Sequence, residues 1–182
     1  MLVASVLTGT LASKLKDHAR LSARSAFRTQ VLFDTDRLLQ KAKSNDDILS
    51  VTCMQLSRLL DRSIVAYTKS ENGMSTGRLF AEKKYTYSEN LLNAAEQKAA
   101  EWAFQNGRRT GATTAQFGKS ECLYLAIRAG DRVYGVIGIP MRPEKPDSFE
   151  NSIVLSVVNE CALAMDCLLY TSPSPRDKRQ SR

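Results

Sequence analysis

Few residues of this chain have side chains suited to catalysis, and their spacing does not assemble a reaction centre. The four cysteines form no CxxC pair and show no metal-ligand spacing. Cys53, Cys122 and Cys161 lie in apolar periodic segments, where a cysteine is usually a small buried hydrophobic residue. The single histidine, His18, lies in a polar helical stretch and is interpreted as a solvated residue, not a phosphoacceptor. The sequence therefore predicts no catalytic residue, no metal site and no cofactor.

One loop gathers side chains that suit a small-molecule site. It follows a predicted helix that ends at Gly107 and combines an aromatic residue, two cations and several hydroxyls. A ligand would lie between the sheet and this loop. The candidate lining is Trp102, Arg108, Arg109, Thr110, Thr113, Thr114 and Tyr124. The alternative, which the residues favour, is that the tryptophan fills the core while the arginines face water.

The net charge of +7 raises the question of nucleic-acid binding, which the distribution of charge answers. Residues 1–43 carry eight Lys/Arg and three Asp/Glu, and residues 167–182 carry four Lys/Arg and one Asp. The block between them, 44–166, carries fourteen Lys/Arg against fifteen Asp/Glu. Because the basic residues belong to the two ends, the folded block lacks the positive surface of a nucleic-acid-binding domain. We expect no nucleic-acid partner.

The N-terminal residues suggest the end of a membrane helix. Residues 1–11 are apolar, but eleven residues are too few to span a bilayer, which needs roughly 20. Basic residues follow the apolar run, the order expected where a helix leaves the membrane on its cytoplasmic side. We therefore expect residues 1–13 to end a transmembrane helix; the alternative is a short amphipathic helix packed on the domain. The residues predicted to meet the membrane surface are Lys14, Lys16, Arg20 and Arg24.

A long basic helix is expected next, over residues 14–43, which contain no glycine or proline. Phe27, Val31, Leu38 and Ala42 recur at helical spacing on an otherwise charged helix. Such a single apolar stripe is typical of a two-helix seam between subunits. We interpret the segment as a signalling helix that forms a homodimeric coiled coil, although two aspartates interrupt the stripe.

Residues 44–166 have the pattern of one α+β domain. A helix capped by Ser44 is followed by a strand over 62–68 and a more polar strand over 78–85. A helix over 88–106, two strands over 121–129 and 132–140, and a helix over 149–166 complete the order. Strands joined as hairpins and separated by helices predict an antiparallel sheet flanked by helices.

The tail at 167–182 differs in character from the rest. Its sequence, Cys-Leu-Leu-Tyr-Thr-Ser-Pro-Ser-Pro-Arg-Asp at 167–177, resembles the translation of a transposase-based sequencing adapter. We therefore expect a tail that is not native; read as a natural segment, it would be a disordered basic end.

Three stretches, taken together, resemble KdpD-type sensor histidine kinases, the membrane kinases of a potassium-responsive two-component system. Residues 7–16 (LTGTLASKLK) look like the exit of that family's last transmembrane helix. Residues 102–107 (WAFQNG), with Gly111 and Thr113, resemble the helix end and glycine loop of its GAF domain. Tyr124 and the strand 133–136 (VYGV) resemble the paired strands that follow. The resemblance runs from residue 1 to about residue 166.

This resemblance implies a GAF-like domain at 44–166, preceded by the signalling helix. It also implies a homodimer anchored in the inner (cytoplasmic) membrane, with the GAF-like domain in the cytoplasm. The ATP-dependent kinase domain and a response regulator would be its downstream partners. On this reading the segment itself is not an enzyme and relays a potassium or osmotic signal to a kinase core. Two alternatives stay open: a stand-alone GAF module that binds a small molecule, and a GAF-fold redox enzyme, which would need cysteines at the pocket.

Overall fold

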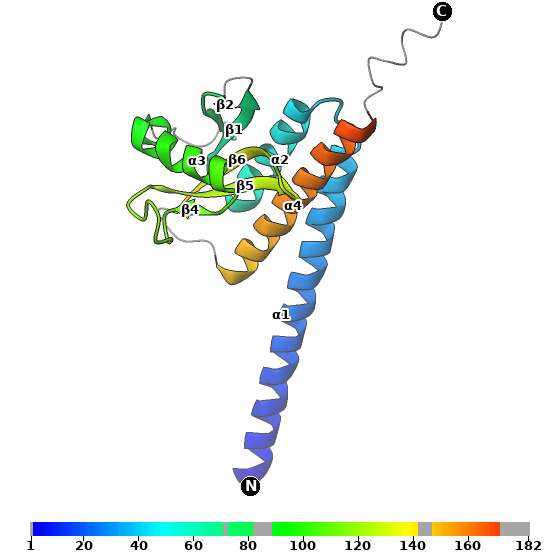
Figure 1. Ribbon diagram of the computed structural model, residues 1–182. Coiled ribbons are helices and arrows are strands. Elements are labelled where there is room, and N and C mark those ends of the chain that lie inside the picture. Colours follow the sequence, from blue (N-terminus) through cyan, green and yellow to red (C-terminus); the bar gives the residue numbers. More distant parts are fainter. Residues whose placement is uncertain (1, 71–72, 82–88, 142–146, 172–182) are drawn as a thin grey trace, which may run out of the picture. The chain divides into compact units, whose positions relative to one another are not determined.

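The fold is described from a computed structural model, which describes residues 2–70, 73–81, 89–141 and 147–171 (Figure 1). Within the first helix, the side chains of residues 2–15, 17 and 20 lie outside the description. The chain divides into two compact units, Met1–Asp34 and Thr35–Arg182. The second unit contains the sheet and all the helices that pack on it.

The first helix, α1, spans Leu2–Leu39 and contributes its last residues to the second unit. In those last turns Thr35 and Leu39 are buried, whereas Leu38 is exposed. In the first unit Leu21, Phe27 and Phe33 are exposed. Of the predicted stripe, Phe27 and Leu38 are exposed and Val31 and Ala42 are half-buried, whereas Leu39, the neighbour of Leu38, packs within its own domain.

Helix α2 (Asn45–Leu60) begins where the sequence predicts. The Ser44 side chain accepts a hydrogen bond from the backbone N–H of Asp47, and Asp46 and Asp47 lie in the first turn, next to the positive end of the helix. The Arg78 guanidinium donates to both carboxylate oxygens of Asp46, at 2.9 and 2.6 Å, and so links the third strand to this turn.

The sheet is antiparallel, with strand order β2-β1-β6-β5-β4 and with β3 also paired to β1. The β5–β6 hairpin is the predicted one, with Ala129 opposite Arg132 around the turn. Two strands of two residues each were not predicted, and the predicted strand over 78–85 is shorter: its residues 82–85 lie outside the described part. The strands are β1 (Ile64–Ser70), β2 (Gly73–Met74), β3 (Arg78–Phe80), β4 (Thr110–Gly111), β5 (Cys122–Ala129) and β6 (Arg132–Pro140).

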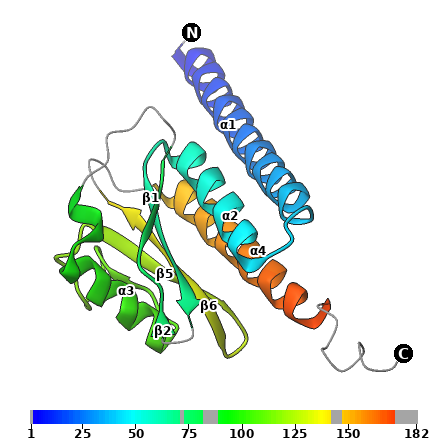
Figure 2. The same cartoon turned by 90° about the horizontal axis from the view of Figure 1, so that it is seen from above.

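Helices cover both faces of this sheet (Figure 2). Helix α2 and the last helix, α4 (Ser148–Thr171), pack on one face and against each other. Helix α3 (Ala94–Asn106) packs on the other face, against β4, β5 and β6. Because side chains alternate along a strand, Val65 and Tyr67 point to α3 whereas Ile64 and Ala66 point to α2 and α4. The predicted α+β class is confirmed.

The predicted helix over 88–106 is wrong in its first part. A 3-10 turn, Glu89–Leu92, comes first, and α3 starts anew after Asn93, whose side chain accepts from the N–H groups of Ala95 and Glu96. The sequence pattern predicts an inner face of Leu91, Leu92, Ala95, Ala99, Trp102 and Ala103, and of these Leu91, Ala99 and Ala103 are buried. The buried face is Glu96, Ala99, Ala100 and Ala103, whereas Leu92 and Ala95 are exposed.

Within the described residues, one helical segment is long and apolar enough to cross a membrane by length and composition, at Ser148–Tyr170 in α4. Its inner residues Ile153, Val157 and Cys161 are fully buried, and α4 packs on both α2 and β5. Core helices of globular domains satisfy the same criterion, so we interpret α4 as the core helix of this domain.

Candidate functional site

The seven residues predicted to line a ligand site do not share one environment. Arg108, Arg109 and Thr113 are exposed, Trp102 is half-buried and Tyr124 is fully buried. The alternative prediction was that the arginines face water and that the tryptophan fills the core. The arginines do face water, whereas the tryptophan is only partly covered. The ligand site at this loop stays a prediction.

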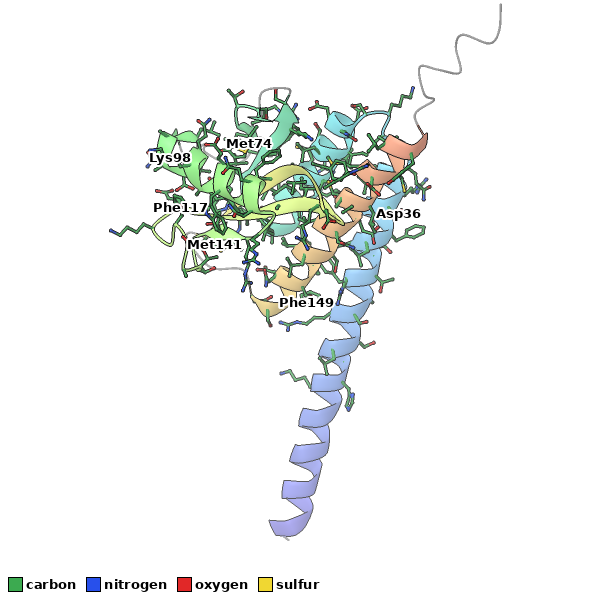
Figure 3. All side chains as sticks on the ribbon, viewed as in Figure 1. Asp36, Met74, Lys98, Phe117, Met141 and Phe149 are labelled. Atoms are coloured by element: carbon green, nitrogen blue, oxygen red, sulfur yellow. The ribbon has the colours of Figure 1, made fainter. Side chains whose placement is uncertain are left out.

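Hydrogen bonds within the loop occupy its threonine hydroxyls. Thr110 and Thr114 both donate to the carbonyl oxygen of Gln116, at 2.9 and 2.7 Å, and Thr114 also donates to that of Gly111. Gly111 has φ +91°, and a Cβ there would lie 2.2 Å from the carbonyl oxygen of Cys122. Only glycine fits at this point, where the loop returns to the sheet. Phe117 lies exposed on the same loop (Figure 3).

A buried carboxylate, which the sequence analysis missed, lies beside this loop. Glu96 is only 3% exposed and lies in the first turn of α3. Its oxygens accept from the backbone N–H groups of Glu121 and Cys122, at 2.8 and 3.3 Å, and from the Tyr124 hydroxyl at 2.8 Å. The positive end of the helix adds to these donors. A buried charge needs such partners, so Glu96 joins α3 to the start of β5 and closes the loop between them.

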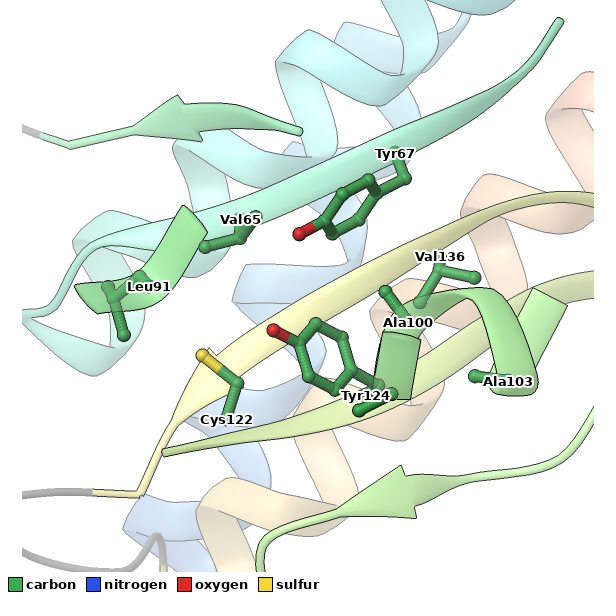
Figure 4. Close-up of a cluster of buried hydrophobic side chains, with 9 residues drawn as sticks. Val65, Tyr67, Leu91, Ala100, Ala103, Cys122, Tyr124 and Val136 are labelled. Atoms are coloured by element: carbon green, nitrogen blue, oxygen red, sulfur yellow. The ribbon is translucent and has the colours of Figure 1, made fainter. Parts of the chain in front are cut away.

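A second tyrosine, Tyr67 on β1, packs next to Tyr124, with ring centroids 6.2 Å apart and planes tilted by 59° (Figure 4). Tyr67 is 1% exposed, and its hydroxyl has no hydrogen-bond partner in the described part of the chain. The rings lie close to glycine backbone: a Cβ at Gly77 would come within 2.8 Å of the Tyr67 ring, and one at Gly138 within 2.6 Å of the Tyr124 ring. The space between α3 and the sheet is thus filled by the protein's own side chains.

The two tyrosines and the thiol of this cluster stay protonated at neutral pH. Burial raises the pKa of Tyr67 to about 12 and, helped by the nearby Glu96 carboxylate, raises the pKa of Cys122 to about 12. Burial also raises the pKa of Tyr124 far above its ordinary value. A neutral thiol is a poor nucleophile and a neutral phenol a poor base. The cluster therefore has the properties of a structural core.

The remaining buried thiols agree with the sequence-based expectation. Cys53 and Cys161, on the opposite side of the sheet, are fully buried and unpaired, like Cys122. Burial raises the pKa of Cys161 to about 12 and also raises that of Cys53. Among the described residues, no group of three or more His, Cys, Asp or Glu side chains is arranged to hold a metal ion.

Comparison with known proteins supports the resemblance seen in the sequence. The chain is 27% identical to the sensor protein KdpD of Clostridium acetobutylicum over 184 residues, which cover 98% of this chain and 20% of that protein. The chain thus spans about a fifth of the length of this relative. No family model matches the sequence.

Solved structures define the fold. The GAF domain of the potassium sensor histidine kinase KdpD from Escherichia coli matches with a TM-score of 0.58 and 17% identity, over 78% of this chain and 95% of that one. The GAF domain of an Acinetobacter phosphoenolpyruvate-protein phosphotransferase matches with a TM-score of 0.56 and 10% identity, over 81% and 97%. Residues 122 to 287 of a methyl-accepting chemotaxis protein give a TM-score of 0.57 and 10% identity, over 76% and 99%.

The resemblance to KdpD-type sensors is confirmed by the alignment, and the GAF-like fold by these structures. The chain is therefore similar along nearly its whole length to a KdpD sensor protein, and its second unit has the GAF-like fold.

Proposed function

We propose that this chain is the regulatory segment of a membrane-bound two-component sensor histidine kinase that responds to potassium or osmotic conditions. In this role it relays a signal from a membrane domain to a kinase core. The observation that carries the proposal is the alignment with a KdpD sensor over 98% of this chain. The buried cluster around Glu96 fits the same role, because its thiol and phenols are protonated and belong to the core.

The way in which α4 is held supports a relay. Helix α4 packs on β5 and α2, and the Tyr134 hydroxyl of β6 donates a hydrogen bond to Asp166 in α4. Helix α1 contributes Thr35 and Leu39 to the same domain, and both are buried. The domain thus has one helix entering it and one leaving it. Rigid helices that shift between two packed arrangements are a common means of transmitting a change of state.

We propose that the signalling helix dimerises. Phe27 and Leu38 are exposed on the same face of α1, and large exposed apolar side chains on one helix face suit a second helix. Changing Phe27 to Glu should convert a dimer to a monomer in sedimentation equilibrium. Changing the exposed polar Thr29 to Glu on the same helix should leave the dimer intact.

A membrane location belongs to the same proposal. Residues 1–13 would end a transmembrane helix in the inner (cytoplasmic) membrane and leave the GAF-like domain in the cytoplasm. Of the four basic residues expected at the membrane surface, Lys16 and Arg24 are exposed, and the side chains of Lys14 and Arg20 lie outside the described residues. Near an anionic leaflet each such residue contributes about 1 kcal/mol.

The proposal is tested by a chimera. Residues 1–166 would replace the matching segment of the Clostridium acetobutylicum KdpD sensor, and autophosphorylation from labelled ATP would be measured in membrane vesicles at low and high potassium. We expect a kinase activity that depends on potassium, as in the parent protein. A chimera that is inserted and folded, yet has the same activity at every potassium concentration at which the parent responds, would contradict the relay. A stand-alone binding module would give this second result.

A further inference from the structure

The two central strands of the sheet separate before either of them ends. Pairing between β1 and β6 extends as far as Thr68 opposite Gly135. Beyond that point Lys69 of β1 pairs with β2, whereas Arg132 of β6 pairs with β5. We call this opening between the strands, at Lys69 on one side and residues 132–134 on the other, the fork. Residues from both sides of the fork line a cavity of about 770 Å³.

The charged residues that line this cavity are mainly cations. Lys69 and Arg132 contribute two positive charges, and Asp131 is the only carboxylate among the described lining residues, so the net charge is positive. Lys69 is exposed and has no ion-pair partner in the described part of the chain. A free ammonium and a guanidinium that line one cavity form a favourable place for a carboxylate, sulfonate or phosphate.

The uncharged lining has a polar part, which includes Asn45, Thr68 and Gln105, and an apolar part. Phe104 comes from the last turn of α3, Val133 from β6 and Met165 from α4, so three elements contribute. Phe104 and Val133 are half-buried and Met165 is fully buried. A concave apolar surface with a few convergent charged groups, at a volume of several hundred Å³, is the usual form of a small-molecule site.

We propose that the fork binds a small amphipathic anion, with its negative group between Lys69 and Arg132 and its apolar body against Phe104, Val133 and Met165. This site is separate from the loop residues 108–114, and it goes beyond the relay function proposed above. Because Tyr134 also lines the cavity and donates to Asp166, a ligand in the fork would contact the strand that holds α4.

Two fluorescent probes that differ in charge test the proposal on the 182-residue chain. 8-Anilinonaphthalene-1-sulfonate carries the anionic group, and N-phenyl-1-naphthylamine is its uncharged counterpart. Each is titrated against the unchanged chain, against Lys69→Gln/Arg132→Gln, and against the matched control Arg108→Gln/Arg109→Gln on the loop. We expect the fork variant to bind the sulfonate about tenfold more weakly and the uncharged probe equally well. The control should bind both probes as the unchanged chain does.

The remaining outcomes would each overturn the proposal. If the control variant lost as much affinity for the sulfonate as the fork variant, the anion would be assigned to the loop. Equal loss of both probes would show that the fork variant has lost apolar packing and not a charge contact. The site would be disproved if the unchanged chain did not bind the sulfonate, or if the fork variant bound it as tightly as the unchanged chain. If the double variant fails to fold by circular dichroism, Lys69→Gln alone repeats the test, because that side chain is exposed and makes no described ion pair.

Discussion

The two faces of the sheet hold their helices by different means. On the side of α2 and α4 the fully buried contacts are mainly apolar, from residues such as Leu56, Ile153 and Val157. Two polar links on that side, from Tyr134 to Asp166 and from Arg78 to Asp46, are partly exposed. On the side of α3, a carboxylate on the helix accepts three hydrogen bonds from β5 and the residue before it.

The two kinds of contact differ in what they determine: apolar burial mainly determines how stably a helix is held, and hydrogen bonds to a buried carboxylate determine where it is held. Apolar burial stabilises roughly in proportion to area and has no direction, so a helix held by it alone can shift or rotate at moderate cost. A carboxylate with three donors has one arrangement in which all are satisfied. We infer that α2 and α4, the helices next to the proposed relay, are on the adjustable side, and that α3 and its loop are on the fixed side.

The largest effect is expected on the apolar side. Changing Ile153 to Ala removes a fully buried side chain from α4 and should lower the free energy of unfolding by about 3 kcal/mol. Urea denaturation followed by circular dichroism measures this value. Leu155→Ala on the same helix, where the side chain is 47% exposed, is the control and should change it by less than about 0.5 kcal/mol. Equal effects from the two variants would show that the α4 face has been assigned wrongly.

On the α3 side, Glu96→Leu should lower the free energy of unfolding by about 2 kcal/mol, because the N–H of Cys122 and the Tyr124 hydroxyl lose their acceptor while buried. Changing the exposed Glu101 of the same helix to Leu is the control. A double-mutant cycle with Tyr124→Phe sharpens the result: removing both partners should cost less than the sum of the single changes. Strict additivity would mean that the hydroxyl and the carboxylate do not interact.

These two predictions concern features that differ in how well the sequence reveals them. The β5–β6 hairpin and the helix capped by Ser44 follow from local signals, a turn with glycine and a capping side chain, and both were predicted. The start of α3 after Asn93 and the burial of Glu96 were not, because Asn93 lies inside a continuous helical pattern and Glu96 reads as a solvated charge. Its burial is set by donors 25 to 28 residues away in the chain. Sequence periodicity carries no trace of such partners.

The candidate sites show the same limit. The loop residues from Arg108 to Thr114 were predicted as a site from their residue types, yet the hydroxyls of Thr110 and Thr114 bond to the loop's own backbone. The fork brings together Lys69 and Arg132, which are far apart in the sequence and belong to strands that pair only over part of their length. No spacing rule connects two such residues. Only the point at which the strands separate identifies them.

The two tyrosines of the α3 side should respond to the same change with opposite signs. Tyr67→Phe removes a buried hydroxyl without a described partner and should raise the free energy of unfolding by about 1 kcal/mol. Tyr124→Phe removes a donor to Glu96 and should lower it by about 1 kcal/mol. Urea denaturation of both variants in parallel gives the two values. A loss of stability in Tyr67→Phe would mean that its hydroxyl has an acceptor, such as a water molecule, in solution.

The smallest effect at neutral pH involves two of the buried thiols, one from each face. The pKa values of Cys122 and Cys161 are raised by burial to about 12, so folding favours the protonated thiols. Both contributions are complete below pH 9, the ordinary pKa of a thiol, and are lost as pH rises from 9 to about 12. Over that window each thiol should contribute a fall of about 1.4 kcal/mol per pH unit in the free energy of unfolding.

Urea denaturation between pH 8 and about 10.5 should therefore show a shallower slope in Cys122→Ala and in Cys161→Ala alike. Val136→Ala, a buried change without a titrating group, should lower stability and leave the slope unchanged. If only one cysteine variant changes the slope, water reaches the other thiol, and the two faces differ in how tightly they exclude it as well as in how they hold their helices.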